Sequence, residues 1–393
     1  MIYSKHHRLI PKESSSALVL AGAGSGVSNW VKSNLLQADE NFIVMDPNGE
    51  YVKATGNFLK ESGYIVQTLN LISPEKGSHY NPFVYERSDS RIQNIVDAIL
   101  KNTKEQREDG YFNDAERKLL CAIMACFLET ESNKDNLTMQ KFVQFVETLS
   151  APAKEDGFFK RIENAEEDSI SKRYYDAFQE YVSDKIKDTV CISCLVDVQN
   201  LFTESMLKCM EKDELHLDEW KNEKKALFII THPVEQKNTS VLPILFSQLF
   251  DFLSSEVNSW KHSLHCIMDE FRSCGVIPNI NNAILYEGEG FHVTCILQEL
   301  SQMEECYKVM SSQYLNSFKN YLLLGKPKED EFPYFIKRLH TPVNNLETLK
   351  KKQCLLMLKG WKKPDKDKAF NYKRHSAYKK TGDRKASQLY SID

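Results

Sequence analysis

The chain of 393 residues contains a glycine-rich segment, AGAGSGVS (21–28), whose residue types could bind phosphate. Its glycines, Gly22, Gly24 and Gly26, allow the backbone to curl and to point N–H groups at an anion. A P-loop has the pattern G-x-x-x-x-G-K-[ST], in which the lysine reaches the β and γ phosphates. Here Ala21 replaces the first glycine and Val27 replaces the lysine. An apolar side chain cannot replace that cation.

Three further polar sites follow apolar runs. Asp46 follows FIVM, and Gln298 follows HVTCIL. Asp269 and Glu270 follow LHCIM, as in a Walker B motif, where one carboxylate holds Mg²⁺ and the next polarises water. In isolation, a glycine-rich turn is often only a tight turn, and an Asp-Glu pair is often a helix cap. Because ligands bind at the carboxyl ends of parallel strands, the convergence of these residues predicts a nucleotide-type site.

The elements that must position these residues are short, buried strands alternating with helices. Apolar runs bounded by polar or turn residues predict strands. Helical periodicity separates several of them, which favours an α/β fold with a predominantly parallel sheet. The predicted strands cover residues 17–20, 42–45, 64–71, 226–230, 264–268, 292–297 and 321–324.

Between residues 86 and 200 only helical periodicity is present, which predicts an all-helical insert domain. The insert would interrupt a core made of residues 1–85 and 201–349. Residues 350–393 are expected to form a short strand followed by a basic tail. No apolar stretch reaches the roughly 18 residues that a membrane helix needs, so we expect a cytoplasmic protein without a transmembrane segment.

Residues 350–385 hold fourteen Lys and Arg against three Asp and Glu, a charge of +11, whereas the whole chain has −4. Aromatic residues lie among these cations, and the mixture can neutralise phosphates and stack bases. The alternative is a solvated tail that maintains solubility. The DNA-binding candidates are Lys362, Lys363, Lys373, Arg374, Lys379 and Lys380.

No zinc or other metal site is expected from the histidines and cysteines. Cys191 and Cys194 form a lone C-x-x-C without a second ligand pair at suitable spacing. His6, His7, His232 and His375 likewise lack a second ligand at metal-binding spacing. Ten cysteines scattered through apolar segments fit buried thiols in a reducing compartment.

Several motifs, in this order, resemble the type IV coupling proteins of conjugative DNA transfer (TraG/TraD class), with an ending similar to that of Gram-positive members. The resemblance covers nearly the whole chain and implies a RecA-like P-loop NTPase core that binds ATP and Mg²⁺. It also implies that the helical insert engages relaxosome cargo. The motifs are AGAGSGVS, DPNGE (46–50), GYIVQTLNL (63–71), YNPF (80–83), ALFIITHP (226–233), MDEFRSCGVIPN (268–279), CILQELSQ (295–302), LLLGKP (322–327) and KGWKKPDKDKAFNYKRHSAY (359–378).

The resemblance assigns roles residue by residue. It implies nucleotide contacts for Gly22, Gly24, Ser25, Gly26, Val27 and Ser28, Mg²⁺ ligation by Asp269 and Ser28, and catalytic roles, here vestigial, for Glu270 and Gln298. Two departures stand out. Val27 replaces the lysine, and Glu287 and Glu289 lie where the family carries an arginine that reaches the neighbouring subunit's nucleotide. Losing such an arginine costs about 10³–10⁵ in rate. A substitute lysine, Lys12 or Lys32, lies outside the loop.

We therefore expect a coupling-protein-like accessory in DNA transfer through a type IV secretion system, one that binds nucleotide weakly and does not hydrolyse it. Its expected partners are DNA or relaxosome proteins, a membrane-bound coupling protein or secretion component that would hold it at the inner face of the membrane, and further copies of itself. The alternative is an active soluble DNA-translocating ATPase of the same family, so whether the chain is an enzyme stays open. A third hypothesis is a folded relic of a mobile element.

Overall fold

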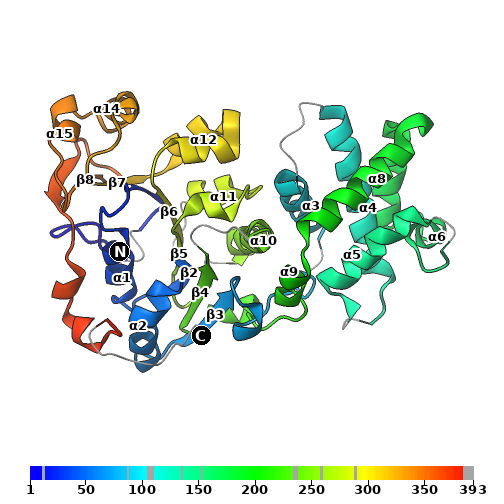
Figure 1. Ribbon diagram of the computed structural model, residues 1–393, viewed down its shortest axis with the longest axis horizontal. Coiled ribbons are helices and arrows are strands. Elements are labelled where there is room, and N and C mark those ends of the chain that lie inside the picture. The colour runs from blue at the N-terminus through cyan, green and yellow to red at the C-terminus, as the bar shows by residue number, and fades with distance from the viewer. Residues whose placement is uncertain are drawn as a thin grey trace.

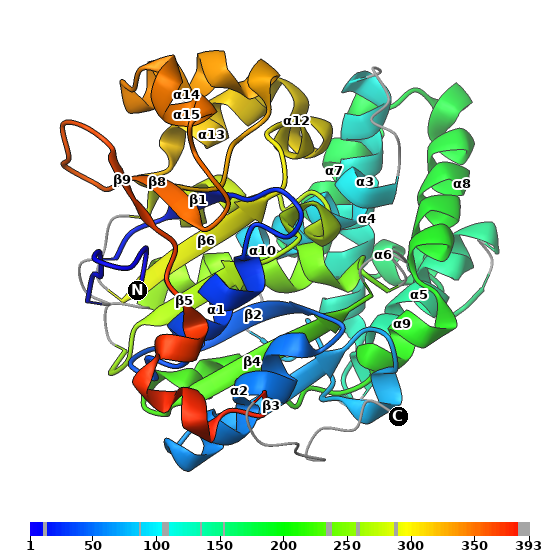
Figure 2. The same ribbon diagram turned by 60° about the vertical axis from the view of Figure 1, so that its left-hand side comes forward.

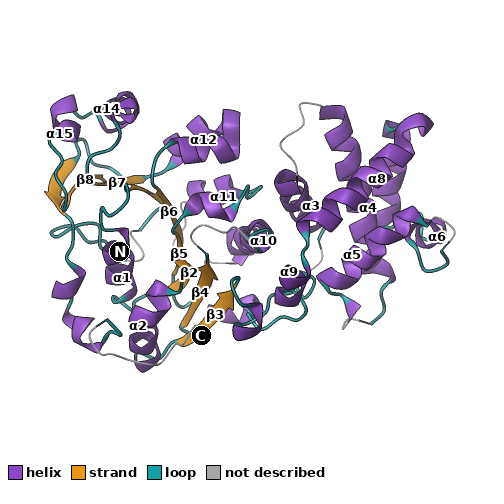
Figure 3. Cartoon of the chain, viewed as in Figure 1, coloured by secondary structure: helices purple, strands orange, loops and turns teal. Residues whose placement is uncertain are grey.

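The computed structural model describes residues 1–10, 14–85, 88–103, 110–133, 136–151, 154–232, 238–256, 260–286 and 290–383. One nine-stranded sheet runs through the molecule in the order β3-β4-β2-β5-β6-β1-β7-β8-β9 (Figures 1 and 3). The strands are β1 Ala17–Leu20, β2 Asn41–Pro47, β3 Ile65–Asn70, β4 Lys225–Thr231, β5 Leu264–Met268, β6 Phe291–Leu297, β7 Asn320–Leu324, β8 Gln353–Met357 and β9 Asp365–Lys368.

The first seven strands are parallel, and β8 and β9 complete one edge in antiparallel fashion. The seven strands predicted from apolar runs all form, and the fold class with its helical insert is confirmed. The sequence analysis expects one short strand after residue 350, but the structure has two there. The second, β9, reads DKDK and is largely exposed, so it carries no apolar signal and forms by pairing with β8.

Helices cover both faces of the sheet (Figure 2). Alternate strand residues point to opposite faces, so Leu18 and Ile43 join one core, whereas Val19 and Val44 join the other. The α-helices are α1 Val27–Leu35, α2 Glu50–Glu61, α3 Asp89–Thr103, α4 Gly110–Thr130, α5 Met139–Glu147, α6 Phe158–Glu163, α7 Ile170–Tyr181, α8 Asp184–Leu201, α9 Glu204–Cys209, α10 Val241–Glu256, α11 Ile280–Leu285, α12 Ser301–Tyr307, α13 Ser311–Ser317, α14 Phe332–Leu339 and α15 Val343–Glu347.

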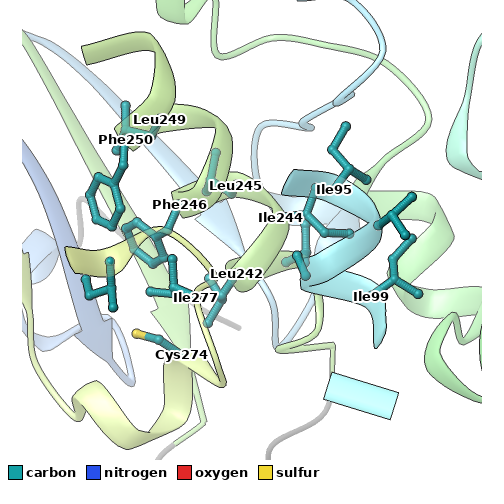
Figure 4. Packing of buried hydrophobic residues seen from close by; sticks show 14 of the residues in the cluster. Ile95, Ile99, Leu242, Ile244, Leu245, Phe246, Leu249, Phe250, Cys274 and Ile277 are labelled. Carbon is teal, nitrogen blue, oxygen red and sulfur yellow. The ribbon is translucent and has the colours of Figure 1, made fainter. Parts of the chain in front are cut away.

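Helices α3 to α9 form the helical insert on one side of the sheet (Figure 1). Helix α10 lies between the sheet and α3. Phe246 and Phe250 of α10 stack on each other on the sheet side, and Ile244 lies on the side that faces Ile95 of α3 (Figure 4). Because the side chains of α10 contribute to one buried apolar cluster with both neighbours, the insert is continuous with the core of the sheet.

A polar contact also joins the helical insert to the rest of the molecule. Asn102 of α3 accepts a hydrogen bond from the backbone N–H of Val276 at 2.8 Å and donates to its carbonyl at 2.9 Å. The adjacent Gly275 has φ +68°, and a Cβ built there would overlap Oδ1 of Asn102. Among the described residues, no helix is both long and apolar enough to cross a bilayer.

We expect Gly275→Ala to destabilise the protein more than Gly360→Ala. Both glycines have a positive φ, so both substitutions strain the backbone, by about 1–3 kcal/mol each. A Cβ at Gly360 meets nothing within 4 Å, whereas one at Gly275 displaces Asn102 and breaks its two hydrogen bonds, a further cost of about 1–3 kcal/mol. Urea denaturation of the two variants measures the difference, and equal losses would contradict the role of Asn102.

Candidate nucleotide-binding site

A cavity of about 430 Å³ opens at the carboxyl ends of β1, β5 and β6. Its floor is the segment 21–28, which leaves β1 and enters α1. Gly26 has φ +110° and is the N-cap residue of α1, so Val27 occupies the first helical position. A left-handed residue at that point suits glycine because it has no Cβ. The loop therefore has the strand–turn–helix context that a P-loop requires.

Most of the residues predicted from the sequence meet in this cavity. Gly22, Gly24, Gly26, Val27 and Ser28 line it from one side, and Asp269, Glu270 and Gln298 line it from the strand ends. Ser25 is the exception among the loop residues. Its hydroxyl is buried without a hydrogen-bond partner among the described residues, and its backbone N–H donates to the carbonyl of Gly22 at 3.1 Å.

The two acidic residues after β5 have different environments. Asp269 is buried, accepts a hydrogen bond from the hydroxyl of Tyr51, and accepts another from the backbone N–H of Glu270 at 2.9 Å. Burial raises the pKa of Asp269 to about 6, although the Tyr51 bond lowers it. Glu270 has a left-handed backbone (φ 53°), and its carboxylate accepts from Nε2 of Gln298 at 3.2 Å.

Asp46 does not line the cavity, contrary to the sequence prediction of a shared polar site. Its buried carboxylate accepts hydrogen bonds from the backbone N–H groups of Tyr51 and Val52, both at 2.8 Å, and so caps the start of α2. Burial raises the pKa of Asp46 to about 7 despite these two bonds. A carboxylate at a strand end therefore serves here as a helix cap.

Three residues that the sequence did not place in the site also line the cavity, namely Lys32, Glu50 and Tyr51. Lys32 lies 2.6 Å from Glu50 and 3.0 Å from Asp383, measured from its Nζ to the carboxylate oxygens. Burial opposes the charge of Lys32, but its hydrogen bonds to Glu50 and Asp383 raise its pKa overall. Ser28 also donates to Glu50, at 3.1 Å. Glu50 lies in the quoted motif DPNGE and could have been considered, whereas Lys32 was set aside because it lies outside the loop.

The cavity carries more negative than positive charge. Among its described lining residues, Lys32 is the only cation, whereas Glu50, Asp269 and Glu270 are acidic. Such a site suits a divalent cation, because carboxylates and hydroxyls are the oxygen ligands that Mg²⁺ takes together with phosphate. Glu287 and Glu289, predicted at the position of the family's arginine, lie outside the described residues, as does Lys12.

The six basic candidates after β8 are all exposed. Lys362 and Lys363 lie in the connection between β8 and β9, and the others lie in or beside two short 3₁₀ helices, η10 (Tyr372–Arg374) and η11 (Ser376–Lys380). This part of the tail is folded against α1 and α2. Tyr372 is buried, and the backbone N–H of Gly382 donates to the carbonyl of Ala54 at 2.8 Å. Asp383 thereby reaches the cavity cation Lys32.

The chain is similar to known proteins over most of its length. Residues 7–341 match the family described as Type IV secretory system Conjugative DNA transfer. The fold is similar to the bacterial conjugative coupling protein TrwBdeltaN70 in complex with sulphate (15% identity, TM-score 0.65, covering 91% of this chain and 86% of that one). The complex of TrwB with ADP and Mg²⁺ gives 14% identity, a TM-score of 0.66, and coverage of 93% and 90%.

VirB4 of Thermoanaerobacter pseudethanolicus is also similar in fold, with 11% identity, a TM-score of 0.56, and coverage of 93% of this chain and 91% of that one. No curated protein is significantly similar in sequence. At these identities the solved structures establish that the fold is shared.

The raised pKa of Asp269 predicts a pH-dependent stability in the absence of nucleotide and Mg²⁺. A carboxyl whose pKa rises on folding, here from 3.8 to about 6, contributes stability that is fully present below about pH 4 and is lost as the pH rises through about 6. We expect the wild type to lose on the order of 3 kcal/mol relative to Asp269→Asn over this interval.

Urea denaturation of both proteins at pH 4 to 8 measures this difference. Tyr51→Phe removes the hydrogen bond that lowers the pKa of Asp269, so in that variant the loss should extend to higher pH. A difference between wild type and Asp269→Asn that does not change with pH would show that the carboxyl is not perturbed.

Proposed function

Because this chain belongs to the type IV secretion coupling protein family of conjugative DNA transfer, we propose that it is an accessory that binds nucleotide weakly and does not hydrolyse it. It would act by binding DNA or relaxosome proteins, and by associating with an active coupling protein or a secretion component at the membrane. Its P-loop NTPase fold would then serve as a scaffold rather than as a motor.

The observation that carries this proposal is the placement of charge around the P-loop. Val27 is the first residue of α1 and offers an apolar surface where a P-loop lysine would reach the phosphates. The cation that does line the cavity, Lys32, is already paired with Glu50 and Asp383. The carboxylates of the cavity would therefore repel a nucleoside triphosphate unless Mg²⁺ accompanied it. Removing one preorganised donor from a reacting group costs about 10²–10³ in rate.

A second candidate function, a DNA-translocating ATPase, is favoured by the other half of the cavity. Asp269, Glu270 and Gln298 lie together where a metal ion and an attacking water would be held, and Ser28 lies at the metal-ligand position of the loop. If Mg²⁺-nucleotide displaced Glu50, Lys32 would be released toward the phosphates. This function requires that Lys32 replaces the missing lysine.

Calorimetric titration with ATP and Mg²⁺ distinguishes the two functions. We expect the wild type to bind ATP no more tightly than the millimolar range, and Val27→Lys to bind it at least tenfold more tightly, a difference of about 1.4 kcal/mol. Val27→Met is the matched control, because it lengthens the side chain without adding charge. Micromolar binding by the wild type that is lost in Lys32→Met would contradict the first function and show that Lys32 replaces the missing lysine. Turnover that DNA stimulates and Glu270→Gln abolishes would establish the second function.

We propose that the folded basic tail binds the DNA backbone. Its six exposed cations can neutralise phosphates, and each phosphate contact adds about 0.9 to the slope of log affinity against log salt. Replacing all six with glutamine should reduce that slope by up to about 5 and weaken binding equally for unrelated DNA sequences. Fluorescence anisotropy over a range of salt concentrations measures both quantities.

The matched control removes the same charge from exposed lysines elsewhere. It replaces Lys76, Lys141, Lys154, Lys185, Lys308 and Lys337 with glutamine. If the control and the tail variant change the slope equally, the tail contributes only through net charge, and its role as the DNA contact is wrong.

A further inference from the structure

A second cluster of chemically capable side chains lies at the amino ends of three strands, whereas the nucleotide cavity lies at the carboxyl ends. Glu40 immediately precedes β2, His265 is the second residue of β5, and His292 is the second residue of β6. These three strands are neighbours in the sheet, and His265 and His292 are register partners (Figure 2). All three side chains are at most 2% exposed. The cluster is therefore buried at the amino ends of the strands.

The three side chains converge on one point. One ligand atom from each lies within 4.8 Å of the other two. Nδ1 of His265 is 3.5 Å from one oxygen of Glu40, and Nε2 of His292 is 3.4 Å from the other. Bonds of about 2.0–2.1 Å that meet at a tetrahedral angle place two ligand atoms about 3.4 Å apart. The two imidazole-to-carboxylate distances match this spacing.

These short approaches are not explained by hydrogen bonds within the described part of the chain. Nδ1 of His265 and both ring nitrogens of His292 have no hydrogen-bond partner there. Burial of unpaired polar atoms is costly. Neutral imidazoles and a carboxylate are the forms that ligate metals.

Neighbouring groups already orient two of the ligands. Nε2 of His265 is 2.8 Å from the hydroxyl of Thr294, which leaves Nδ1 to face Glu40. The hydroxyl of Ser263 donates to Oε2 of Glu40 at 3.5 Å, and the hydroxyl of Tyr64 donates to the backbone carbonyl of the same residue at 2.6 Å. Hydrogen bonds of this kind from the groups behind a ligand fix its tautomer and direction in metal sites. The hydroxyl of Tyr3 is also buried without a described partner, and the charge of Glu40 acts on it.

We propose that Glu40, His265 and His292 bind one transition-metal cation of the Zn²⁺ class. Two imidazoles and one carboxylate suit Zn²⁺, Co²⁺, Ni²⁺ or Cu²⁺, whereas Mg²⁺ and Ca²⁺ prefer oxygen ligands. Water or the hydroxyl of Tyr3 completes the coordination. Because the site is closed to solvent, the metal's role is structural, and it joins β2, β5 and β6 at their amino ends. This inference is independent of the chemistry in the nucleotide cavity.

The test uses the full chain, stripped with a chelator and then titrated with Co²⁺ and with Zn²⁺. We expect one equivalent of Co²⁺ to bind with the visible absorption of a tetrahedral site and without the near-ultraviolet charge-transfer band of a thiolate ligand. That second feature separates this site from the ten free cysteines. Zn²⁺ should displace the Co²⁺ and raise the midpoint of thermal unfolding.

His292→Gln should abolish the stoichiometric binding, whereas His262→Gln should retain it. His262 lies three residues before His265 and is half-buried, so it controls for binding by a histidine near the same strand. Glu40→Gln, which preserves shape and removes the charge, is the second variant if His292→Gln does not fold. Failure of the folded wild type to bind one equivalent of Co²⁺ or Zn²⁺ overturns the proposal, and so does unchanged binding by a folded variant.

Discussion

The balance of charge at the carboxyl edge of the sheet is the constraint on which the candidate site depends. Parallel strands deliver Asp46 and Asp269 to this edge with little solvent around them, so each carboxylate needs its own source of stabilisation. Asp46 obtains it from the first N–H groups of α2, and Asp269 obtains it from the hydroxyl of Tyr51. Both pKa values stay raised, which shows that the local donors compensate burial only in part. A divalent cation at this edge would supply the remaining charge.

The same balance connects the cavity to the end of the chain. Glu50 forms an ion pair with Lys32, and Asp383 forms a second ion pair with the same ammonium group because the tail folds over α1 and α2. A movement of the tail that separates Asp383 from Lys32 would therefore change the positive charge available to a phosphate in the cavity. Under our proposed function, a DNA contact on the tail and the occupancy of the cavity would be coupled through Lys32.

Periodicity in the sequence predicts most of the fold, because buried parallel strands and amphipathic helices leave strong local patterns. It also predicts that a polar site lies at the carboxyl ends of β1, β5 and β6. It does not predict β9, whose charged residues pair only through their backbone. It also misplaces Asp46, because the sequence pattern of a carboxylate at a strand end is the same whether the side chain faces a ligand or caps a helix. Lys32 and Asp383 are 351 residues apart, and the chain between them leaves no local sign of their pairing.

The cluster of Glu40, His265 and His292 shows why spacing along the chain is a weak guide to metal ligands in a parallel sheet. Neighbouring parallel strands are joined by long connections, so residues that are register partners can be far apart in sequence. A search for closely spaced histidines and cysteines finds ligands on one helix or one hairpin and passes over ligands on three strands. The P-loop has the opposite property, since its glycines hold the backbone whether or not a lysine follows. Val27 is therefore compatible with the fold of the loop. Under our proposal, it lacks only the charge that binding and hydrolysis of a nucleotide would need.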